Sequence, residues 1–240
     1  MGGTTNRRAN DRMMEKWKKY DPVWVRKCMA GPNALLLTEA LSESMDLKPD
    51  MMVLDLGCGR ALSSVFLARE FGAAVYAVDP KTHASETFQM LKDIGMDSKV
   101  FPIQAEAAAL PIMPGTVDAL VCINAYHNFG MEPSFFGEHL RPLLKPGAQV
   151  GLVLLATDAA YVAEDDLQEN EQPAFWSAAN WRRWFSRDLD IQVCEQLSCT
   201  SQAWQDWLAA SNPAMEEGEQ LSAKLNPRLA LVKIVGTAKA

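Results

Sequence analysis

The chain has 240 residues, of which 48% are hydrophobic and 22% are charged, so its composition suits one globular domain with a full core. Its net charge of −7 argues against a general nucleic-acid binder, and no apolar run reaches the roughly 18 residues of a membrane helix. Five scattered cysteines without a C-x-x-C pair argue against a disulfide framework and a zinc site, so we expect a cytoplasmic protein without a bound metal.

Residues 1–48 predict a helical cap or lid. Residues 1–27 carry eight Lys or Arg against three Asp or Glu, and aromatic residues are interspersed among them. The sequence Gly-Pro-Asn at 31–33 is expected to open a further helix with Pro32 in its first turn, where the missing N–H of proline costs nothing. Tyr20 and Trp24 either line the substrate pocket as part of a lid or form an apolar face that packs on the sheet edge.

Residues 49–240 alternate predicted strands and helices, and we treat them as one main domain. The expected strands are 51–56, 73–79, 99–103, 117–123, 149–155, 189–197 and 228–236. The expected helices between them are 61–71, 83–94 and 133–144, then a tryptophan-rich helix after an acidic loop at 164–171, and a helix near Trp204 and Trp207. Alternation at this spacing predicts βαβ units, a parallel sheet and helices on both of its faces.

A glycine-rich turn follows the first of these strands. Asp55 lies in the strand, and Gly57 and Gly59 follow it with Cys58 between them. Ligands of open α/β sheets bind at the carboxyl ends of the strands, and glycines let the backbone approach a ligand closely. A dinucleotide site requires a third small residue three positions after the second glycine, and Leu62 stands there. The turn therefore favours a ligand with a cationic amino acid group over NAD.

Acidic residues follow the next two strands. Asp79 ends the second strand, where a carboxylate can accept hydrogen bonds from both hydroxyls of a ribose. Glu106 follows Ala105 after the third strand, in a position to accept from an adenine amino group. Together with the glycine turn, these residues indicate S-adenosylmethionine.

Five segments together resemble the class I S-adenosylmethionine-dependent methyltransferase family, over about residues 51–155. They are VLDLGCG (53–59), VYAVD (75–79), QAEAAALP (104–111), VDALVCINAYH (117–127) and LLKPGAQVGLV (143–153). The resemblance implies a Rossmann-like, doubly wound, mostly parallel seven-stranded sheet with an antiparallel last strand and an N-terminal helical cap. It also implies S-adenosylmethionine as methyl donor and S-adenosylhomocysteine as product.

The resemblance assigns residues to parts of that cofactor. These are Asp55, Gly57, Cys58 and Gly59 around the methionine moiety, Asn124 beside the sulfonium, Asp79 at the ribose, and Ala105 and Glu106 around the adenine. Two departures stand out. Arg60 occupies a position where a small residue is frequent, and Asn-Ala-Tyr-His at 124–127 replaces the Asn-Pro-Pro-Tyr of enzymes that methylate exocyclic or amide nitrogens. DNA and protein-glutamine acceptors therefore lose support.

The residues after the fourth strand are candidates for the chemistry. Methyl transfer from a sulfonium is an in-line displacement, and a base is needed only when the acceptor carries a proton. His127 is the candidate base, because an unperturbed imidazole accepts a proton near neutral pH. A structural alternative is a histidine that hydrogen-bonds a loop carbonyl. Tyr126 either lines the acceptor pocket as a catalytic residue or packs under the loop.

These observations predict an enzyme that methylates a small molecule at O, N, S or C. The short insertions leave little room for a domain that binds a macromolecule, so we expect neither a nucleic-acid nor a membrane partner, and a monomer or homodimer. One alternative is an RNA- or protein-modifying methyltransferase that docks through the basic N-terminal segment. Another is a non-catalytic S-adenosylmethionine-binding regulatory module, because a fold alone does not give function.

Overall fold

The computed structural model of the chain describes residues 15–157, 176–210 and 229–239. The basic residues before 15 and the acidic loop at 164–171 lie outside these described residues. Among the described residues, no helix is long and apolar enough to cross a membrane.

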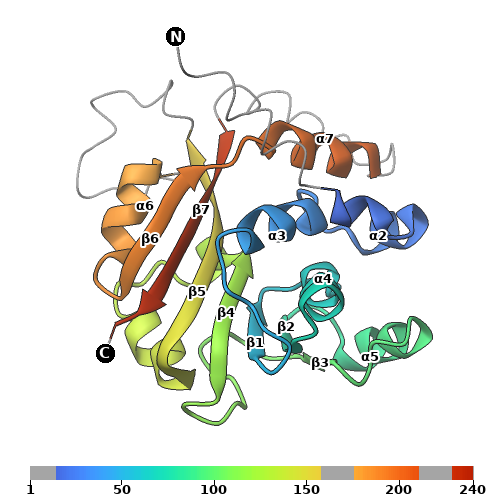
Figure 1. Cartoon of the computed structure of the whole chain (residues 1–240), viewed down its shortest axis with the longest axis horizontal. Helices are drawn as coiled ribbons and strands as arrows, with labels where there is room; N and C mark the ends of the chain where they lie inside the picture. The colour runs from blue at the N-terminus through green and yellow to red at the C-terminus, as the bar shows by residue number, and fades with distance from the viewer. Residues whose placement is uncertain (1–14, 158–175, 211–228, 240) are drawn as a thin grey trace.

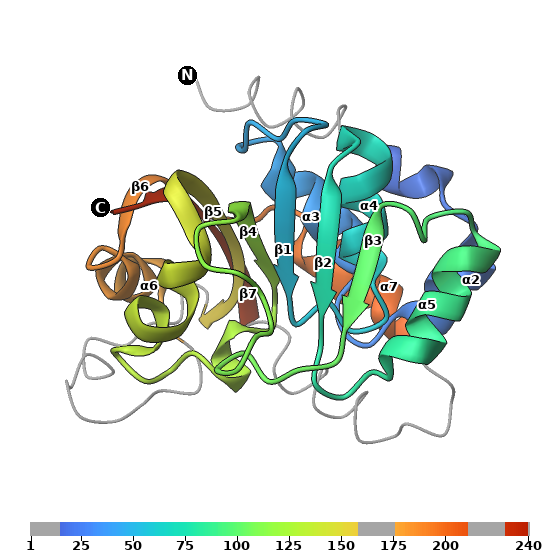
Figure 2. The same cartoon turned by 90° about the horizontal axis from the view of Figure 1, so that it is seen from below.

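Seven strands form a single sheet in the order β3-β2-β1-β4-β5-β7-β6. Their bounds are β1 Met52–Leu56, β2 Ala74–Val78, β3 Val100–Ile103, β4 Val117–Ile123, β5 Leu144–Thr157, β6 Leu189–Gln196 and β7 Leu229–Ala238. The first five strands are parallel, and β7 runs antiparallel to both of its neighbours. Figure 2 shows the arrows of β1, β2 and β3 pointing the same way. The expected seven-stranded sheet with an antiparallel last strand is confirmed.

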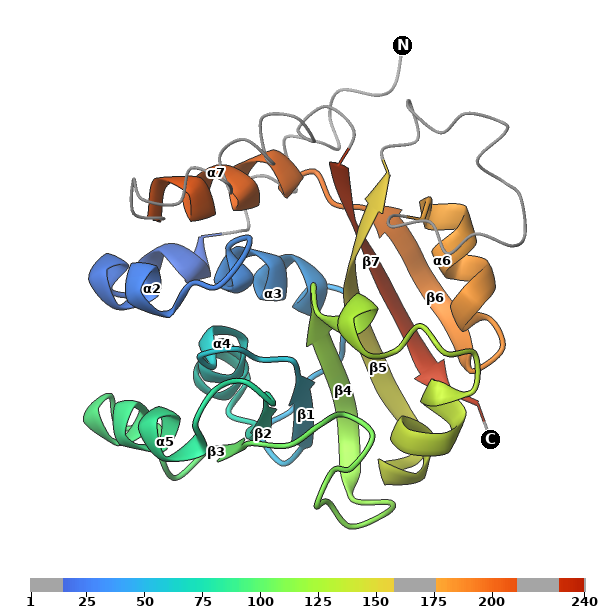
Figure 3. The ribbon, with the colours of Figure 1, turned by 180° about the vertical axis from the view of Figure 1, so that it is seen from behind.

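Helices cover both faces of this sheet. The regular helices are α2 Pro22–Cys28, α3 Ala34–Ser42, α4 Leu62–Phe71, α5 Ala84–Asp93, α6 Ala178–Phe185 and α7 Thr200–Ala210; short helical turns are η1 Lys16–Lys19, η2 Tyr126–Asn128, η3 Phe136–Leu140 and η4 Arg141–Leu143. On one face, α2 and α3 lie between α7 and α4 (Figures 1 and 3). The opposite face carries α6 and the turns that precede β5.

The strand residues alternate between two hydrophobic cores. Val53 packs into the core beneath α3 and α4, whereas Leu54, the next residue, packs into the core beneath α6. Both side chains are fully buried. A strand that is covered on both faces has no solvent side to fill with polar residues, which is why β1 reads as a continuous apolar run.

The segment before β5 differs from the prediction. We expected one helix over 133–144 and a strand from 149, but η3 and η4 end at Leu143 and β5 begins at Leu144. Leu144 pairs with Val117 and Gln149 with Ala119, so the Lys-Pro-Gly sequence at 145–147 forms an irregularity within the strand. The backbone amides of Gly115 and Thr116 donate to carbonyls of η4. These bonds hold the end of η4 beside the start of β4, so β5 begins at Leu144 rather than at Gln149.

A buried carboxylate fixes the first described residues to the core. Glu39 on α3 is 3% exposed, and its two oxygens accept from the backbone amides of Lys16 at 3.1 Å and Trp17 at 2.9 Å. These amides open η1, where N–H groups have no partner within the helix. The cap is therefore packed on α3 and is part of the same folded unit as the sheet.

Candidate functional site

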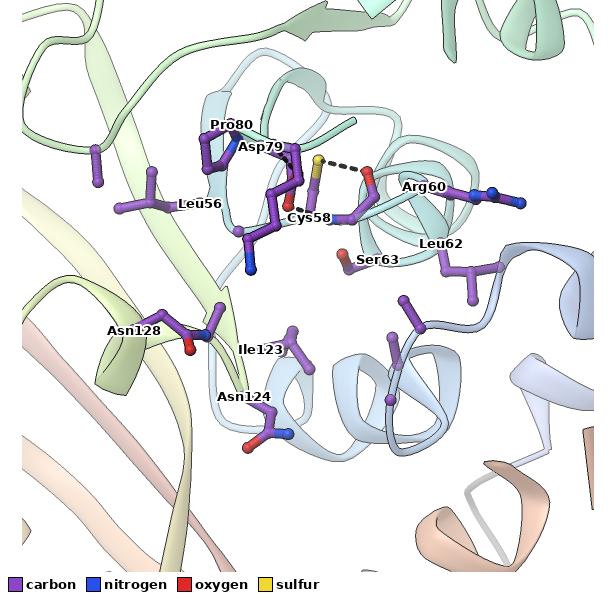
Figure 4. A pocket seen from close by; sticks show the side chains of 18 of the residues that line it. Leu56, Cys58, Arg60, Leu62, Ser63, Asp79, Pro80, Ile123, Asn124 and Asn128 are labelled. Carbon is purple, nitrogen blue, oxygen red and sulfur yellow. Dashed lines mark hydrogen bonds between the residues drawn. The ribbon is translucent and has the colours of Figure 1, made fainter. Parts of the chain in front are cut away.

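A cavity of about 500 Å³ opens at the carboxyl ends of β1, β2 and β4. Its walls come from the glycine turn after β1, the loops after β2 and β3, the residues that follow β4, and the connection between α2 and α3. In Figure 4, Asp79, Cys58 and Ser63 lie along one side of the cavity, and Ile123, Asn124 and Asn128 lie along the other. This is the edge at which open α/β sheets bind ligands.

The glycine turn is shaped by close backbone approach. Gly57 has φ +77°, and a Cβ on it would lie 2.3 Å from the Cβ of Ala125, the residue after Asn124. The backbone amides of Gly57 and Cys58 both donate to the carbonyl of Val78, at 2.8 and 3.0 Å. The turn after β1 is thus held against the loops of both neighbouring strands, and any side chain at position 57 would push them apart.

Asp55 lies one layer beneath this turn. Its side chain is fully buried, and Oδ2 accepts from the hydroxyls of Ser63 and Ser64, both at 2.6 Å. Oδ1 is buried without a hydrogen-bond partner among the described residues. Burial raises the pKa of Asp55 to about 6, although the two serine hydrogen bonds oppose the shift. Ser63 lines the cavity while Asp55 does not, so Asp55 acts on the cavity through the first turn of α4.

The carboxylate of Asp79 is at the cavity wall but is already engaged. Its Oδ1 accepts from the backbone amides of Lys81 and Thr82 and from the Thr82 hydroxyl, at 2.9, 3.0 and 3.1 Å. Its Oδ2 accepts from the Gly59 amide at 3.1 Å. Oδ2 keeps a lone pair for a further donor, whereas Oδ1 could contact a ribose only by giving up part of the turn.

Ala105 and Glu106 line the cavity beside Asp79, as does Asn124 on the opposite wall. Asn124 has φ +50°, a conformation that asparagine tolerates better than most residues. Its amide N–H donates to the Val153 carbonyl at 2.7 Å. Its side-chain Oδ1 is buried and has no partner among the described residues. A buried acceptor without a donor is unusual, and a ligand could reach this oxygen only if the Asn124 side chain turned toward the cavity.

His127 and Tyr126, the proposed catalytic residues, lie on η2 directly after this wall. His127 is half-buried, its Nδ1 is buried without a hydrogen-bond partner in the described part of the chain, and burial lowers its pKa. It adjoins the cavity-lining Asn128 without lining the cavity itself.

Tyr126 has a packing role. It is 1% exposed, and its ring packs against Phe129, Phe135 and Phe185 with centroids 5.4, 6.5 and 4.9 Å away. It does not line the cavity, so of the two expectations for Tyr126 the structure gives packing under the loop, and we assign it no chemical step.

Tyr20 and Trp24 also lie away from the cavity. Tyr20 stacks on Phe66 of α4, with centroids 6.0 Å apart, and Trp24 Nε1 contacts Met90 Sδ of α5 at 3.3 Å. Neither residue lines the cavity. The substrate-pocket assignment of these residues is therefore corrected to an apolar face that packs on α4 and α5.

The part of the cap that does reach the cavity was not predicted. The contributing residues are Cys28, Met29, Ala30, Gly31, Pro32 and Ala34. A helix does begin near the Gly-Pro-Asn sequence at 31–33, but Pro32 lies before it rather than in its first turn. Asn33 is the N-cap of α3 and accepts from the amides of Leu35 and Leu36. The sequence carried no signal for which part of the protein this turn faces.

Cys58 and Arg60, the two residues that flank Gly59, have roles that follow from their surroundings. Burial of the thiol raises the pKa of Cys58 well above its ordinary value, so Cys58 is a half-buried neutral thiol in the cavity wall. Arg60, whose role the sequence left open, donates from Nη1 to the carbonyl of Lys27 at 2.9 Å. No group of three or more His, Cys, Asp or Glu among the described residues could hold a metal ion.

Comparison with known families identifies this architecture. Residues 53–147, from β1 to the start of β5, match the family described as a methyltransferase domain. Over these residues the chain matches a methyltransferase domain. The match covers the glycine turn, Asp79, Glu106 and the residues after β4, so the resemblance inferred from the five segments is confirmed. The cap, α6, α7 and the two last strands lie outside it.

Solved structures share the fold of the methyltransferase domain at low sequence identity. Geranyl diphosphate C-methyltransferase from Streptomyces coelicolor A3(2) is 18% identical, with a TM-score of 0.66 over 85% of this chain and 77% of that chain. Phosphoethanolamine N-methyltransferase 2 from Haemonchus contortus is 16% identical, with a TM-score of 0.69 over 100% of this chain and 62% of that chain. The [4+2]-cyclase SpnF is 14% identical, with a TM-score of 0.69 over 88% of each chain.

A curated relative matches over a shorter stretch. Protein arginine N-methyltransferase 1 of Chlamydomonas reinhardtii is 31% identical over 72 residues, which are 30% of this chain and 21% of that protein. The chain thus aligns with about a fifth of the length of this relative.

The residues present fit S-adenosylmethionine, the cofactor that this family implies. The cradle at Gly57 is one that a Cβ would fill, and Asp79 Oδ2 and Glu106 supply acceptors at one wall. Asn124 at the opposite wall carries a side-chain oxygen without a partner among the described residues, which leaves it a polar group to offer a ligand if its side chain turns. The glycine turn, Asp79, Ala105, Glu106 and Asn124 would hold it.

Proposed function

We propose that this chain is an S-adenosylmethionine-dependent methyltransferase that acts on a small-molecule acceptor. The observation that carries the proposal is the cavity at the carboxyl edge of β1, β2 and β4, whose walls hold the matched motif residues Gly57, Asp79 and Glu106. Solved relatives of the same fold are methyltransferases in complexes with small molecules, which supports a small acceptor here.

Bound S-adenosylmethionine would supply an electrophilic methyl group, and the residues of the chain would orient it. Positioning of two reactants can lower the barrier by roughly 7–11 kcal/mol. The rigid turn at Gly57 and the strained backbone of Asn124 are suited to this task, because both are fixed by hydrogen bonds to neighbouring strands. We propose that the acceptor approaches from the side of Asn124 and Asn128.

We further propose His127 as the base for an acceptor that carries a proton. Burial lowers its pKa, so the imidazole is neutral at pH 7 and can accept a proton. Its buried Nδ1 has no partner among the described residues, which argues against a histidine held through Nδ1 by a loop carbonyl. For His127 to act as the base, the acceptor must extend from the cavity beyond Asn128 and contact the imidazole.

His127→Ala is therefore expected to lower kcat at least tenfold while the affinity for S-adenosylhomocysteine stays within a few-fold. In the wild type, kcat/KM should be flat above pH 7 and fall only below the ordinary histidine pKa of about 6.5. Steady-state kinetics and calorimetry measure these quantities. Unchanged turnover in the variant would remove His127 from the mechanism.

Two measurements test the proposed function in order. Calorimetry with S-adenosylhomocysteine should detect binding at one site, and the absence of binding would defeat the proposal. Incubation with isotope-labelled S-adenosylmethionine and a pooled metabolite extract should then yield a product with the mass increase of one methyl group. Binding without any labelled product, in either metabolites or macromolecules, would leave a regulatory module or a different reaction such as the cyclisation carried out by SpnF.

A protein acceptor is the second candidate. It is favoured by the 72-residue similarity to a protein arginine methyltransferase. Adding a protein extract to the same labelling reaction distinguishes a protein acceptor from a small-molecule acceptor. A protein acceptor would carry the label into the protein fraction, whereas a small-molecule acceptor would leave it among the metabolites. We also propose a cytoplasmic location, which the five free cysteines support.

A further inference from the structure

The connection between α2 and α3 forms a wall of the cavity but has little structure of its own. Residues 28–32 and Ala34 line the cavity. Residues 30–32 make no backbone–backbone hydrogen bond with other described residues. We call residues 29–33 the connector. A segment of this kind keeps its position only if its ends are held by other parts of the protein.

One end of the connector is held by the glycine turn. Arg60 Nη1 donates to the carbonyl of Lys27 at 2.9 Å. Lys27 lies in the last turn of α2, where carbonyl groups lack helical partners, so the guanidinium satisfies one of them. This contact joins the connector to the turn of the methyltransferase motif itself.

The other end is held by α7. Asn33 is 1% exposed, and its backbone amide donates to the Ala203 carbonyl at 2.9 Å. Its Nδ2 donates to Asp206 Oδ2 at 2.7 Å, while its Oδ1 caps α3. A short bond from a buried amide to a carboxylate is a charge-assisted hydrogen bond and stronger than a neutral one.

The helix that holds the connector is in turn fixed to the sheet. Thr200, the first residue of α7, accepts at Oγ1 from the Leu231 amide of β7 at 3.1 Å and donates to the Leu197 carbonyl at 2.8 Å. Figure 1 shows α7 lying across α2 and α3 on the side away from α4. The chain of contacts therefore runs from β7 through α7 and Asn33 to the cavity wall, over elements outside residues 53–147.

We propose that Asp206 is a positioning residue for the cofactor cavity, which acts through Asn33 to hold the connector in its ligand-binding position. This inference rests on the proposed function for the identity of the ligand. Without Asp206, the buried Nδ2 of Asn33 loses its acceptor, and the connector is free to leave the wall. The ligand must then order the connector as it binds, which weakens affinity chiefly through faster dissociation.

The test compares Asp206→Ala with Gln205→Ala. Gln205 is exposed on the same helix, and its side chain hydrogen-bonds Ser201 of that helix, so it is a matched control. We expect Asp206→Ala to bind S-adenosylhomocysteine at least tenfold more weakly by calorimetry, and the Asn33 amide, which donates to the Ala203 carbonyl, to exchange its hydrogen at least tenfold faster. The control should resemble the wild type in both. Wild-type affinity and exchange in Asp206→Ala would overturn the proposal.

An exchange of the two side chains separates positioning from a general loss of folding. Asn33→Asp alone keeps a helix-capping carboxylate but sets it against Asp206, so affinity should fall at least tenfold. Combining Asn33→Asp with Asp206→Asn restores a donor–acceptor pair of reversed direction, and affinity should return to within about threefold of wild type. A double variant no better than the Asn33→Asp single variant would overturn the proposal.

The exchange measurement does not depend on a ligand, which separates this proposal from the proposed function. If the wild type fails to bind S-adenosylhomocysteine, the proposed function fails. In that case, faster exchange of the Asn33 amide in Asp206→Ala still supports the role of Asp206 in holding the connector, and unchanged exchange of that amide overturns it.

Discussion

At the scale of single residues, the site depends on polar groups that are buried before any ligand arrives. Asp55 is the clearest case: its carboxylate is fully buried, and among the described residues it accepts side-chain hydrogen bonds from the hydroxyls of Ser63 and Ser64 alone. A charge in this position costs free energy, because two neutral donors do not replace the hydration of a carboxylate. The ionised Asp55 therefore lowers the free energy of unfolding while it holds the first turn of α4 through Ser63 and Ser64.

This cost predicts a pH dependence of stability. Burial raises the pKa of Asp55 to about 6, whereas an unfolded aspartate titrates near 3.9. The folded state binds the proton more tightly, so the stabilising contribution of this group is complete below pH 4 and is lost as the pH rises through 6. In the cofactor-free protein, the free energy of unfolding relative to Asp55→Asn should fall by on the order of 1 kcal/mol per pH unit between pH 4 and 6.

Urea denaturation of the wild type and Asp55→Asn at several pH values measures this difference. Taking the difference between the two proteins removes the contribution of all other titrating groups. A difference that does not vary with pH would contradict a raised pKa for Asp55.

At the scale of elements, the cap has two parts with different roles. Its aromatic residues Tyr20 and Trp24 pack on α4 and α5, whereas the connector and its neighbours Cys28 and Ala34 line the cavity. The sequence left open whether these aromatic side chains form a lid or an apolar face that packs on the sheet edge. The structure uses them to attach the cap to the core, which leaves the small residues of the connector to face the cavity.

This division predicts that Trp24→Ala costs stability rather than cofactor affinity. The half-buried indole contacts Met90, so its loss should lower the free energy of unfolding by roughly 2 kcal/mol, less than for a fully buried tryptophan. Affinity for S-adenosylhomocysteine should stay within about threefold. Val23→Ala, at a position 62% exposed on the same helix, is the control and should change neither quantity. A tenfold loss of affinity at unchanged stability would restore the lid interpretation.

At the scale of the whole molecule, the site is built from one sheet shared by two cores. The strands β1 and β4 contribute side chains to both cores, and the cavity lies at their carboxyl ends. The cap and α7 are attached to the same sheet through α3 and β7. A ligand in the cavity therefore contacts segments that are far apart in the sequence, and its binding should stabilise the entire fold.

Thermal unfolding tests this expectation. S-adenosylhomocysteine at 100 times its Kd should add about 2.7 kcal/mol to the free energy of unfolding. For a chain of this size, that corresponds to a rise in Tm of roughly 5–10 °C. NAD at the same concentration should leave Tm unchanged, because Leu62 stands where a dinucleotide site requires a small residue. An equal shift with NAD would contradict the exclusion of a dinucleotide.

The sequence by itself determined the parts of the site that are local in the chain. The order of strand, glycine turn and helix at 52–71 and the acidic residue after β2 were predicted within a residue or two. These features follow from hydrophobic periodicity and from backbone conformations that glycine adopts, and both are properties of short segments. The parallel sheet followed because strands alternated with helices at a βαβ spacing.

Only the tertiary structure decided which distant residues meet. Asn33 and Asp206 are 173 positions apart, and nothing in either segment specifies that one hydrogen-bonds the other. The same holds for the burial of Tyr126, the attachment of Trp24 to α5 and the contact of Arg60 with α2. Each of these is fixed by how helices pack on the sheet, and packing depends on the shapes of many side chains together rather than on any local pattern.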